Sequence, residues 1–453
     1  MGRVSVMSIA ERLERLPLSA FHYKMLFICG IGWLFDAMDV GLVSFVLPAV
    51  GKEWHLTATQ MGALGSIGLL GMGLGAVFGG SLSDLWGRKR VFNYTLIFYG
   101  LATFLAGLST NYAMLMVLRF LVGLGLGAEV PVAFTLASEF SPVQYRGRMA
   151  VLLESFWAFG WIAAALIGYL AVPHWGWRLA FFIGALPALY AAVLRRALPE
   201  SPRYLEKIGK ESEARAIVES IERSCGVDPG KVATSPAAAT AETSVKATFA
   251  DLWSSRYARR TLCLWILWFG INFSYYGIVT WLPSLMVGKG FAIIKSFEYV
   301  LIMTLGQVPG YFSAAYLVEK IGRKATLVSY LILSGVAAYM FSLSTTTSQI
   351  IWWGLAVYFF NLGAWGVLYA YTPEMYPTAI RATGSGWASF CGRIGAILAP
   401  VIVGQMIVVM GQAKAYPLIF VLFTAVFVIT ALGMLALGIE TKGKTLEELV
   451  GIR

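Results

Sequence analysis

Charged residues are scarce in this sequence: Asp, Glu, Lys and Arg together make up 13% of its 453 residues. An ordinary soluble domain carries roughly a quarter, so the composition excludes a soluble globular enzyme of this length. Histidine and cysteine are scarcer still, with three and four residues. The cysteines show no paired spacing and the histidines no metal-binding spacing, so we expect no disulfide framework, no metal and no cofactor.

Motifs of nucleotide-driven or hydrolytic chemistry are missing as well. The sequence contains no GxxxxGK[ST] phosphate-binding loop and no nucleophile elbow. The repeat Gly123-x-Gly125-x-Gly127 lies in an apolar stretch, where small residues serve helix packing rather than nucleotide binding. An enzyme, or a protein driven by ATP hydrolysis, is therefore disfavoured.

Long apolar stretches dominate the sequence, which is 58% hydrophobic. A membrane-spanning helix needs about 20 mostly apolar residues, and twelve stretches qualify. They lie at about 24–48, 61–82, 91–109, 111–136, 148–171, 178–198, 259–286, 297–318, 325–344, 348–371, 384–410 and 415–438. We therefore predict an all-α membrane protein with 12 transmembrane helices.

One long interruption, residues 199–258, follows the sixth apolar stretch. It starts with an amphipathic charged run and becomes rich in Ala, Thr and Ser, which is typical of a surface helix followed by a flexible linker. The sequence thus predicts a six-helix bundle over residues 1–198, a cytoplasmic linker with an amphipathic helix over residues 199–258, and a second six-helix bundle with a short tail over residues 259–453.

The net charge of +11 follows the predicted topology. Clusters such as Arg88-Lys89-Arg90 and Arg195-Arg196 follow every second apolar stretch, whereas the loops between them hold only isolated cations. Cytoplasmic loops carry the excess of Lys and Arg, so we expect both termini in the cytoplasm. Because topology accounts for the positive charge, we expect no nucleic-acid partner.

The two halves repeat each other at a fixed offset. Residues 80–89 recur as residues 315–324, an offset of 235 (319 − 84), and the same offset relates an acid, a proline and an arginine further along each half. Acids and bases at the same helix ends can pair and hold one conformation closed; plain positive-inside loops would explain the bases but not the acids. The predicted gating residues are Asp84, Gly87, Arg88, Glu139, Arg146, Glu319, Arg323, Glu374 and Arg381.

These repeated motifs, with Pro199-Glu-Ser-Pro-Arg203, resemble the major facilitator superfamily over essentially the whole chain. The D-x-x-D spacing of Asp36 and Asp39 is similar to that of aromatic acid–proton symporters. The segments 138–161, 275–283 and 371–377 resemble bacterial niacin (nicotinate) uptake transporters, which are relatives of the organic anion and cation transporters.

The resemblance implies two pseudo-symmetric six-helix bundles that move about a central site by alternating access. It also implies that a monomer imports nicotinate, a small aromatic carboxylate, into a bacterial cell across the inner membrane, with protons as the coupling ion. Facilitated diffusion, a benzoate- or hydroxybenzoate-type symporter, a sugar porter and a receptor without transport stay open as alternatives.

Five buried ionisable residues are candidates for proton coupling. Asp39 and Arg119 lie about 13 Å and about 12 Å from the outer ends of their helices, so they can pair, and neutralising Asp39 would free the helices to move. Asp36 lies three residues away on the same face. Glu129 and Glu154 are at similar distances from their inner helix ends and can be neighbours. The alternative for these residues is a purely structural role.

Arg393 is the candidate clamp for a substrate carboxylate. It lies in an apolar stretch without an acid, and its equivalent in the first half, Ala158, is uncharged. The resemblance implies a basic residue here in the organic anion branch; the alternative is an ion pair with Asp36 or Glu154. Aromatic side chains would stack on the substrate ring and polar ones would meet its heteroatoms. The other predicted binding residues are Trp157, Trp161, Tyr275, Tyr276, Gln307, Asn361, Trp365 and Tyr369.

Overall fold

Helices form all the secondary structure in the computed structural model, which describes residues 9–142, 145–227 and 249–442. The first half contains α1 (Ile9–Glu14), α2 (Ala20–Glu53), α3 (Ala58–Trp86), α4 (Arg88–Gly107), α5 (Tyr112–Phe140), α6 (Arg146–Trp175), α7 (Trp177–Gly184) and α8 (Pro187–Ala197). Two short helices follow, α9 (Pro202–Lys207) and α10 (Glu211–Ser224).

The second half repeats this order. It contains α11 (Phe249–Leu252), α12 (Ala258–Gly288), α13 (Ile293–Thr304), α14 (Gln307–Ile321), α15 (Arg323–Leu343), α16 (Thr347–Glu374), α17 (Thr378–Met410) and α18 (Gln412–Leu437). Each of the twelve apolar stretches is helical, but the sixth and the eighth are each divided in two. Pro187, which has no N–H to donate, begins α8, and Gly306 lies between α13 and α14 against the carbonyl oxygen of Leu355.

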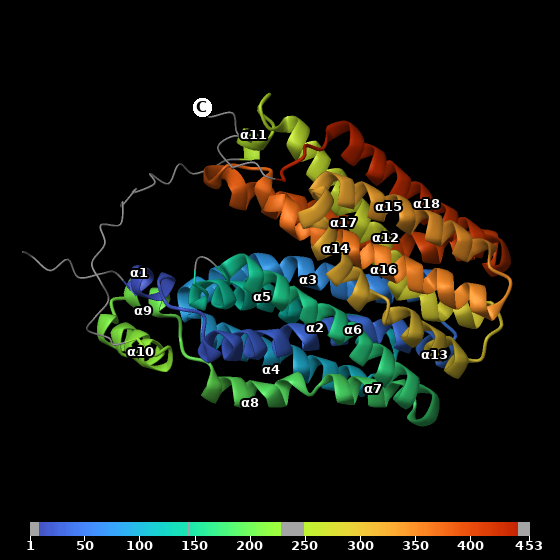
Figure 1. Cartoon of the computed structure of the whole chain (residues 1–453). Helices are drawn as coiled ribbons and strands as arrows, with labels where there is room; N and C mark the ends of the chain where they lie inside the picture. The colour runs from blue at the N-terminus through green and yellow to red at the C-terminus, as the bar shows by residue number, and fades with distance from the viewer. Residues whose placement is uncertain (1–8, 143–144, 228–248, 443–453) are drawn as a thin grey trace, which may run out of the picture.

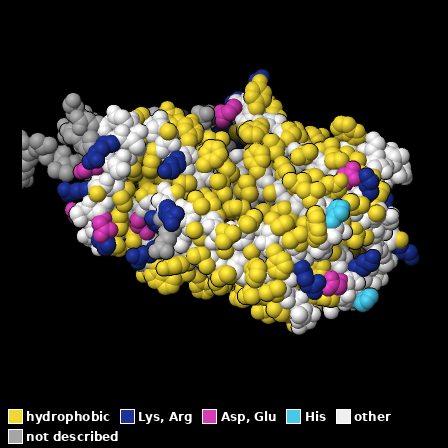
Figure 2. All heavy atoms as spheres, turned by 90° about the horizontal axis from the view of Figure 1, so that it is seen from below, with side chains coloured by type: hydrophobic (Ala, Val, Ile, Leu, Met, Phe, Trp, Pro, Cys, Tyr) yellow, Lys and Arg dark blue, Asp and Glu magenta, His cyan; other side chains and the backbone are white. Residues whose placement is uncertain are grey.

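Eleven helical segments in the described ranges are long and apolar enough to cross a membrane. The remaining predicted span, α4, is excluded from this set because it begins with three basic residues and also carries Asn93. It still packs between α5 and α8 as part of the bundle. Hydrophobic side chains cover the middle of the face shown in Figure 2, and charged side chains gather towards its two ends, with histidines at the right-hand end. The prediction of an all-α membrane protein is confirmed.

Figure 1 shows two bundles side by side, one built from α2 to α8 and the other from α12 to α18. We call the end where α1, α9, α10 and α11 lie, on the left of Figure 1, the linker end. Arg12 of α1 donates hydrogen bonds of 2.8 and 2.6 Å to Glu222 of α10, which joins the two helices at this end.

Glycines let neighbouring helices of one bundle touch through their backbones. A side chain at Gly75 of α3 would collide with the carbonyl oxygen of Leu124 of α5, and Gly123 and Gly127 of α5 lie equally close to α3. The same contact recurs in the second half, where Gly310 of α14 faces the carbonyl oxygen of Phe359. Small residues at helix interfaces are the usual means of close packing in membranes.

This packing makes a Gly75→Ala substitution destabilising. We expect the free energy of unfolding to fall by about 1–3 kcal/mol, because the added methyl group forces α3 and α5 apart. Thermal unfolding of the purified protein in detergent measures the effect. Gly386→Ala is the matched control, since a side chain there meets nothing within 4 Å; equal melting temperatures for the two variants would contradict the packing argument.

The two bundles meet closely at the end opposite the linker end. Here α3 and α17 approach through Gly62, which faces the carbonyl oxygen of Pro400, and through Gly404, which faces the carbonyl oxygen of Ala58. Thr59 donates a hydrogen bond of 3.1 Å to Gln405 in the same region. Further towards the middle, the hydroxyl of Ser66 donates one of 2.7 Å to the carbonyl oxygen of Ile397.

Candidate functional site

A cavity of about 780 Å³ lies between the two bundles. Its inner part is lined by residues from the middle of the helices, such as Glu154 and Arg393, and it extends to Glu319, Arg323 and Glu374 at the linker end. The contacts between α3 and α17 close the opposite end. The cavity is therefore reached from the linker end.

Aromatic side chains form matching walls on the two sides of the cavity. Trp33 and Phe134 meet edge to face with ring centroids 5.3 Å apart, and their equivalents at the offset of 235, Trp268 and Tyr369, meet edge to face at 5.4 Å. Each half adds one more ring: Trp157 lies 4.8 Å from Trp33, and Trp365 stacks on Tyr369 at 5.6 Å. A flat apolar molecule can lie between such walls.

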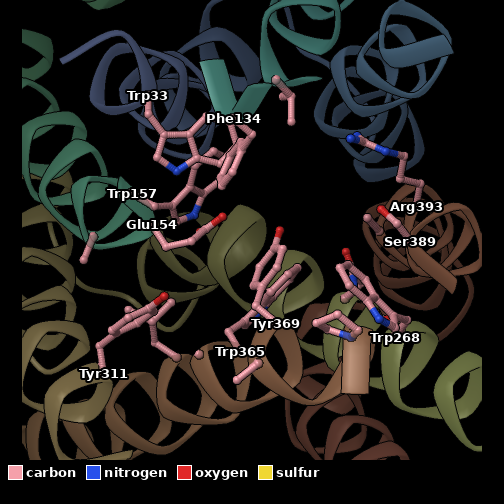
Figure 3. A pocket seen from close by; sticks show the side chains of 18 of the residues that line it. Trp33, Phe134, Glu154, Trp157, Trp268, Tyr311, Trp365, Tyr369, Ser389 and Arg393 are labelled. Atoms are coloured by element: carbon pink, nitrogen blue, oxygen red, sulfur yellow. The ribbon is translucent and has the colours of Figure 1, made fainter. Parts of the chain in front are cut away.

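Two opposite charges face this aromatic cavity from different bundles. Glu154 of α6 and Arg393 of α17 extend from opposite walls, with Tyr369 between them in Figure 3. The repeat places Glu154 at the equivalent of Ser389, and Arg393 at the equivalent of Ala158, and all four line the cavity. Both halves therefore contain both positions. The first half carries its charge at the first position, as Glu154, and the second half carries its charge at the second position, as Arg393.

Neither charge is neutralised within the part of the chain that the structure describes. Arg393 forms no ion pair there, and Tyr276 and Tyr369 line the cavity together with it. The Oε1 atom of Glu154 is buried without a hydrogen-bond partner. The structure therefore does not contain the alternative ion pair of Arg393 with Asp36 or Glu154.

The nine predicted binding residues divide into two groups. Those that line the cavity are Arg393, Trp157, Tyr276, Trp365 and Tyr369. Those that are buried behind its walls are Trp161, Tyr275, Gln307 and Asn361. The sequence analysis missed Trp33, Phe134, Trp268, Asn272, Tyr311 and Ser389, which also line it. The repeat offset, which relates Trp33 to Trp268 and Phe134 to the predicted Tyr369, was the signal that could have found three of them.

Asp39 and Arg119 form a buried ion pair outside the cavity lining. Nη1 of Arg119 lies 2.8 Å from Oδ2 of Asp39, and the hydroxyl of Thr103 donates a hydrogen bond of 2.9 Å to Oδ1. The pair connects α2, α5 and α4. The ring of Phe181 covers the guanidinium, 5.6 Å from its centroid, so water does not reach the charges.

Asp36 and Glu129 are fully buried acids, and all four of their carboxylate oxygens lack a hydrogen-bond partner among the described residues. Glu129 packs against α2, where a side chain at Gly32 would lie 2.8 Å from Oε1 of Glu129. Glu154 instead faces the cavity. Glu129 and Glu154 therefore lie in different surroundings, although they are at similar distances from their inner helix ends.

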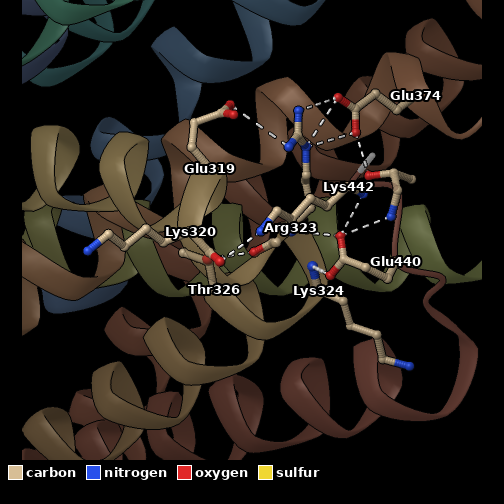
Figure 4. A network of polar contacts seen from close by, with 10 residues as sticks. Glu319, Lys320, Arg323, Lys324, Thr326, Glu374, Glu440 and Lys442 are labelled. Atoms are coloured by element: carbon tan, nitrogen blue, oxygen red, sulfur yellow. Dashed lines mark hydrogen bonds and ion pairs between the residues drawn. The ribbon is translucent and has the colours of Figure 1, made fainter. Parts of the chain in front are cut away.

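At the linker end, the repeated motifs form one polar cluster in each bundle. Arg323 lies 3.0 Å from Glu374 and 3.9 Å from Glu319, as Figure 4 shows. In the first bundle Arg88 lies 3.6 Å from Glu139. These pairs connect neighbouring helices of the same bundle. Arg381 donates a hydrogen bond to the carbonyl oxygen of Tyr376, whereas the side chains of Asp84 and Arg146 lie outside the described residues.

An acid and a hydroxyl complete each cluster. Glu440 accepts hydrogen bonds from the backbone N–H groups of Arg323 and Lys324 at the start of α15, and Thr441 donates to Glu374. Glu200 and Ser201 repeat this arrangement, with Glu200 accepting from the N–H of Lys89 and Ser201 donating to Glu139.

The motif glycines fit this arrangement for two reasons. Gly87 and Gly322 have φ angles of 95° and 93°, which favour glycine, and a side chain at either would collide with Glu200 or Glu440.

Glu440 makes the stability of the protein depend on pH. Burial opposes its ionisation, but hydrogen bonds from the N–H groups of Lys442, Arg323, Lys324 and Thr441 outweigh this and lower its pKa. A lowered pKa stabilises the fold above the ordinary value of about 4.3, and this stabilisation is lost as pH falls through the lower folded-state pKa.

We therefore expect Glu440→Ala to lower the free energy of unfolding at pH 7 by about 0.5–2 kcal/mol, as for loss of a helix cap, and the difference from wild type to shrink in acid. Denaturant unfolding at pH 7 and at pH 4 measures it. Glu213→Ala, on the exposed face of α10, is the control. A deficit that does not change with pH would contradict the capping role of the carboxylate.

Comparisons with known proteins agree in fold and in family. The profile of the sugar (and other) transporter family matches residues 21–451. The chain is 50% identical to the niacin transporter NiaP of Acinetobacter baylyi, over 98% of this chain and 100% of that protein. It is 45% identical to the putative niacin/nicotinamide transporter NiaP of Bacillus subtilis, over 96% and 100%.

Solved transporters share the fold at low sequence identity. The xylose transporter XylE of E. coli, in a partially occluded inward-open conformation, aligns with a TM-score of 0.74 at 17% identity, covering 94% of this chain and 100% of that one. A bacterial homologue of the lysosomal transporter Spinster, inward-facing and unoccupied, aligns at 0.73 and 17%, covering 93% and 98%. At this identity the likeness shows the fold alone.

Proposed function

Because the chain belongs to the sugar (and other) transporter family, within the major facilitator superfamily, we propose that it imports nicotinate across the bacterial inner membrane by alternating access coupled to protons. The chain is a multi-pass membrane transporter and not an enzyme. The observation that carries the proposal is Arg393, an arginine without an ion-pair partner in the described residues, at the wall of an aromatic cavity. The two NiaP relatives support the same cargo.

Arg393 binds the substrate carboxylate in this proposal. A guanidinium presents parallel N–H donors that match a carboxylate, and water-poor surroundings strengthen the pairing. Tyr276 and Tyr369 line the same cavity, and their hydroxyls complete the anion site in this proposal. The pyridine ring then lies between the walls made by Trp33 and Trp157 on one side and Trp365 on the other.

Alternating access follows from the two ends of the cavity. By the positive-inside rule the linker end faces the cytoplasm, so the structure corresponds to an inward-open state. To open outward, the bundles separate where Gly62 faces Pro400 and approach at the linker end. The clusters around Glu139 and Glu374 are rigid helix ends on which that closure acts.

Coupling is assigned to Asp39 and Arg119, which lie outside the cavity lining. Protonation of Asp39 removes the negative charge that holds Arg119, so α2, α4 and α5 can shift relative to one another. Asp36 and Glu129 are buried nearby on two of the same helices and serve as further proton carriers in the proposal.

A benzoate-type symporter is the second candidate, because Arg393 and the aromatic walls also suit an acid without a ring nitrogen. A sugar porter is disfavoured by the lining itself. Sugar sites rely on amide side chains, and among the described lining residues only Asn272 supplies one.

Uptake of labelled nicotinate into liposomes that contain the purified protein tests the proposal. We expect saturable uptake that an inward proton gradient stimulates and that nicotinamide inhibits poorly. Saturable uptake that does not respond to the gradient would contradict proton coupling and leave a facilitator. Uptake of xylose but not nicotinate would overturn the cargo.

A further inference from the structure

Among the described residues deep in the cavity, Glu154 is the charged one that the import of a simple anion does not explain. Its carboxyl faces the same space as the proposed anion site at Arg393, where a second negative charge would repel the substrate. Burying an acid without a hydrogen-bond partner in water-poor surroundings costs free energy. Oε1 of Glu154 is buried without such a partner. A bound molecule that carries a matching group removes the cost.

The position of Glu154 limits what that group can be. Tyr276 and Tyr369 line the same cavity as Glu154 and Arg393, and Figure 3 shows Tyr369 between the two charges. Beside Glu154 are the rings of Trp33 and Trp157. A ligand that reaches both charges is therefore flat, bears its carboxylate at one end, and offers a hydrogen-bonding group at a ring position that is not adjacent to the carboxylate.

We propose that Glu154 is a second residue that binds the substrate: its carboxyl group contacts a basic ring nitrogen while Arg393 binds the substrate carboxylate. The site then selects pyridine carboxylates over benzoates. This inference rests on the proposed function. One proton lies between the two groups: either a protonated Glu154 donates it to the ring nitrogen, or a pyridinium donates its N–H to the carboxylate. Benzoate would place a C–H group against Glu154 and leave the acid without a partner.

The sequence analysis assigned Glu154 to proton coupling, and the two roles predict different results. A residue that only carries a coupling proton affects every aromatic acid alike. A residue that contacts the ring nitrogen affects acids whose nitrogen is not adjacent to the carboxylate, such as nicotinate, and leaves the others unchanged. The ratio of affinities for two acids of the same shape therefore separates the roles.

The test measures dissociation constants of the purified full chain in detergent, by competition with labelled nicotinate, for nicotinate, benzoate and picolinate. We expect the wild type to bind nicotinate about tenfold or more tightly than benzoate, the effect of one unsatisfied buried polar group. Picolinate should bind as weakly as benzoate, because its nitrogen lies next to the carboxylate and cannot reach the opposite wall. This comparison needs no variant.

Glu154→Leu should bring the ratio of the benzoate and nicotinate constants to about one, with benzoate affinity kept. Glu154→Gln, whose amide can still donate to a ring nitrogen, should retain part of the preference. Ser155→Ala is the matched control, since Ser155 follows Glu154 on the same helix, lies outside the cavity lining and donates a hydrogen bond to the carbonyl oxygen of Leu152; its ratio should equal that of the wild type.

Two results would overturn the inference alone: equal wild-type affinities for nicotinate and benzoate, or an equal loss of both acids in Glu154→Leu. Failure of the wild type to bind either acid would overturn the proposed function together with it.

Discussion

Replacing Arg393 by alanine should abolish the preference for an acid over its amide. Wild-type protein should bind nicotinate much more tightly than nicotinamide, whereas Arg393→Ala should bind the two about equally. Truncating one partner of a desolvated charge pair costs about 2–5 kcal/mol, so nicotinate affinity should fall by a factor of about 30 to several thousand. Equilibrium binding to the purified protein measures both constants.

Two companion variants sharpen this prediction. Arg393→Lys keeps the charge but loses the planar pair of donors, so its nicotinate affinity should lie between wild type and alanine. Ile394→Ala changes the next residue, whose side chain is exposed on the outside of the bundle, and should bind like wild type. Full nicotinate affinity in Arg393→Ala would rule out the carboxylate clamp.

Asp39→Asn should convert an accumulating transporter into one that only equilibrates its cargo. With one proton per nicotinate, a gradient of one pH unit sustains about tenfold accumulation in the wild type. Asparagine cannot take up a proton to break an ion pair with Arg119 or release one to form it again, so the accumulation ratio of this variant should be one, while exchange of labelled for unlabelled nicotinate across the liposome membrane continues. Gradient-driven accumulation by Asp39→Asn would show that the pair is structural.

The same pair predicts a distinctive pattern of stabilities. Arg119→Gln leaves Asp39 buried without its counter-charge, which should cost about 3–5 kcal/mol of unfolding free energy. The double variant Asp39→Asn/Arg119→Gln has no unpaired charge and should recover much of that loss. Denaturant unfolding of the single and double variants gives the interaction energy; strictly additive losses would mean that the two side chains do not act on each other.

Hydropathy was enough to predict the twelve helical stretches, because bilayer thickness dictates their length. Depth along a helix was also enough to match Asp39 with Arg119. Depth does not fix how a helix is rotated, however. Gln307 and Asn361 lie at suitable depths but on buried faces, and Glu129 turns towards α2 while Glu154 faces the cavity.

The missed aromatic residues have the same explanation. A tryptophan such as Trp33 or Trp268 in an apolar stretch fits lipid, core or cavity equally well by sequence. Only the packing of the glycine-rich faces of α3 on α5, and of α14 on α16, decides which sides of α2 and α12 are left to line the space between the bundles. Glu440 was missed because it pairs with helix N–H groups, which leave no trace in side-chain spacing.

The four equivalent cavity positions, Glu154 with Ser389 and Ala158 with Arg393, have an evolutionary consequence. Duplication of an ancestral half supplies every wall position twice, so one copy is free to gain a charge while the other keeps the helices packed. The aromatic walls, which both copies retain, preserve a place for a flat ring. Exchange of a few side chains at these positions could therefore redirect such a protein from acidic to basic cargo without building a new fold.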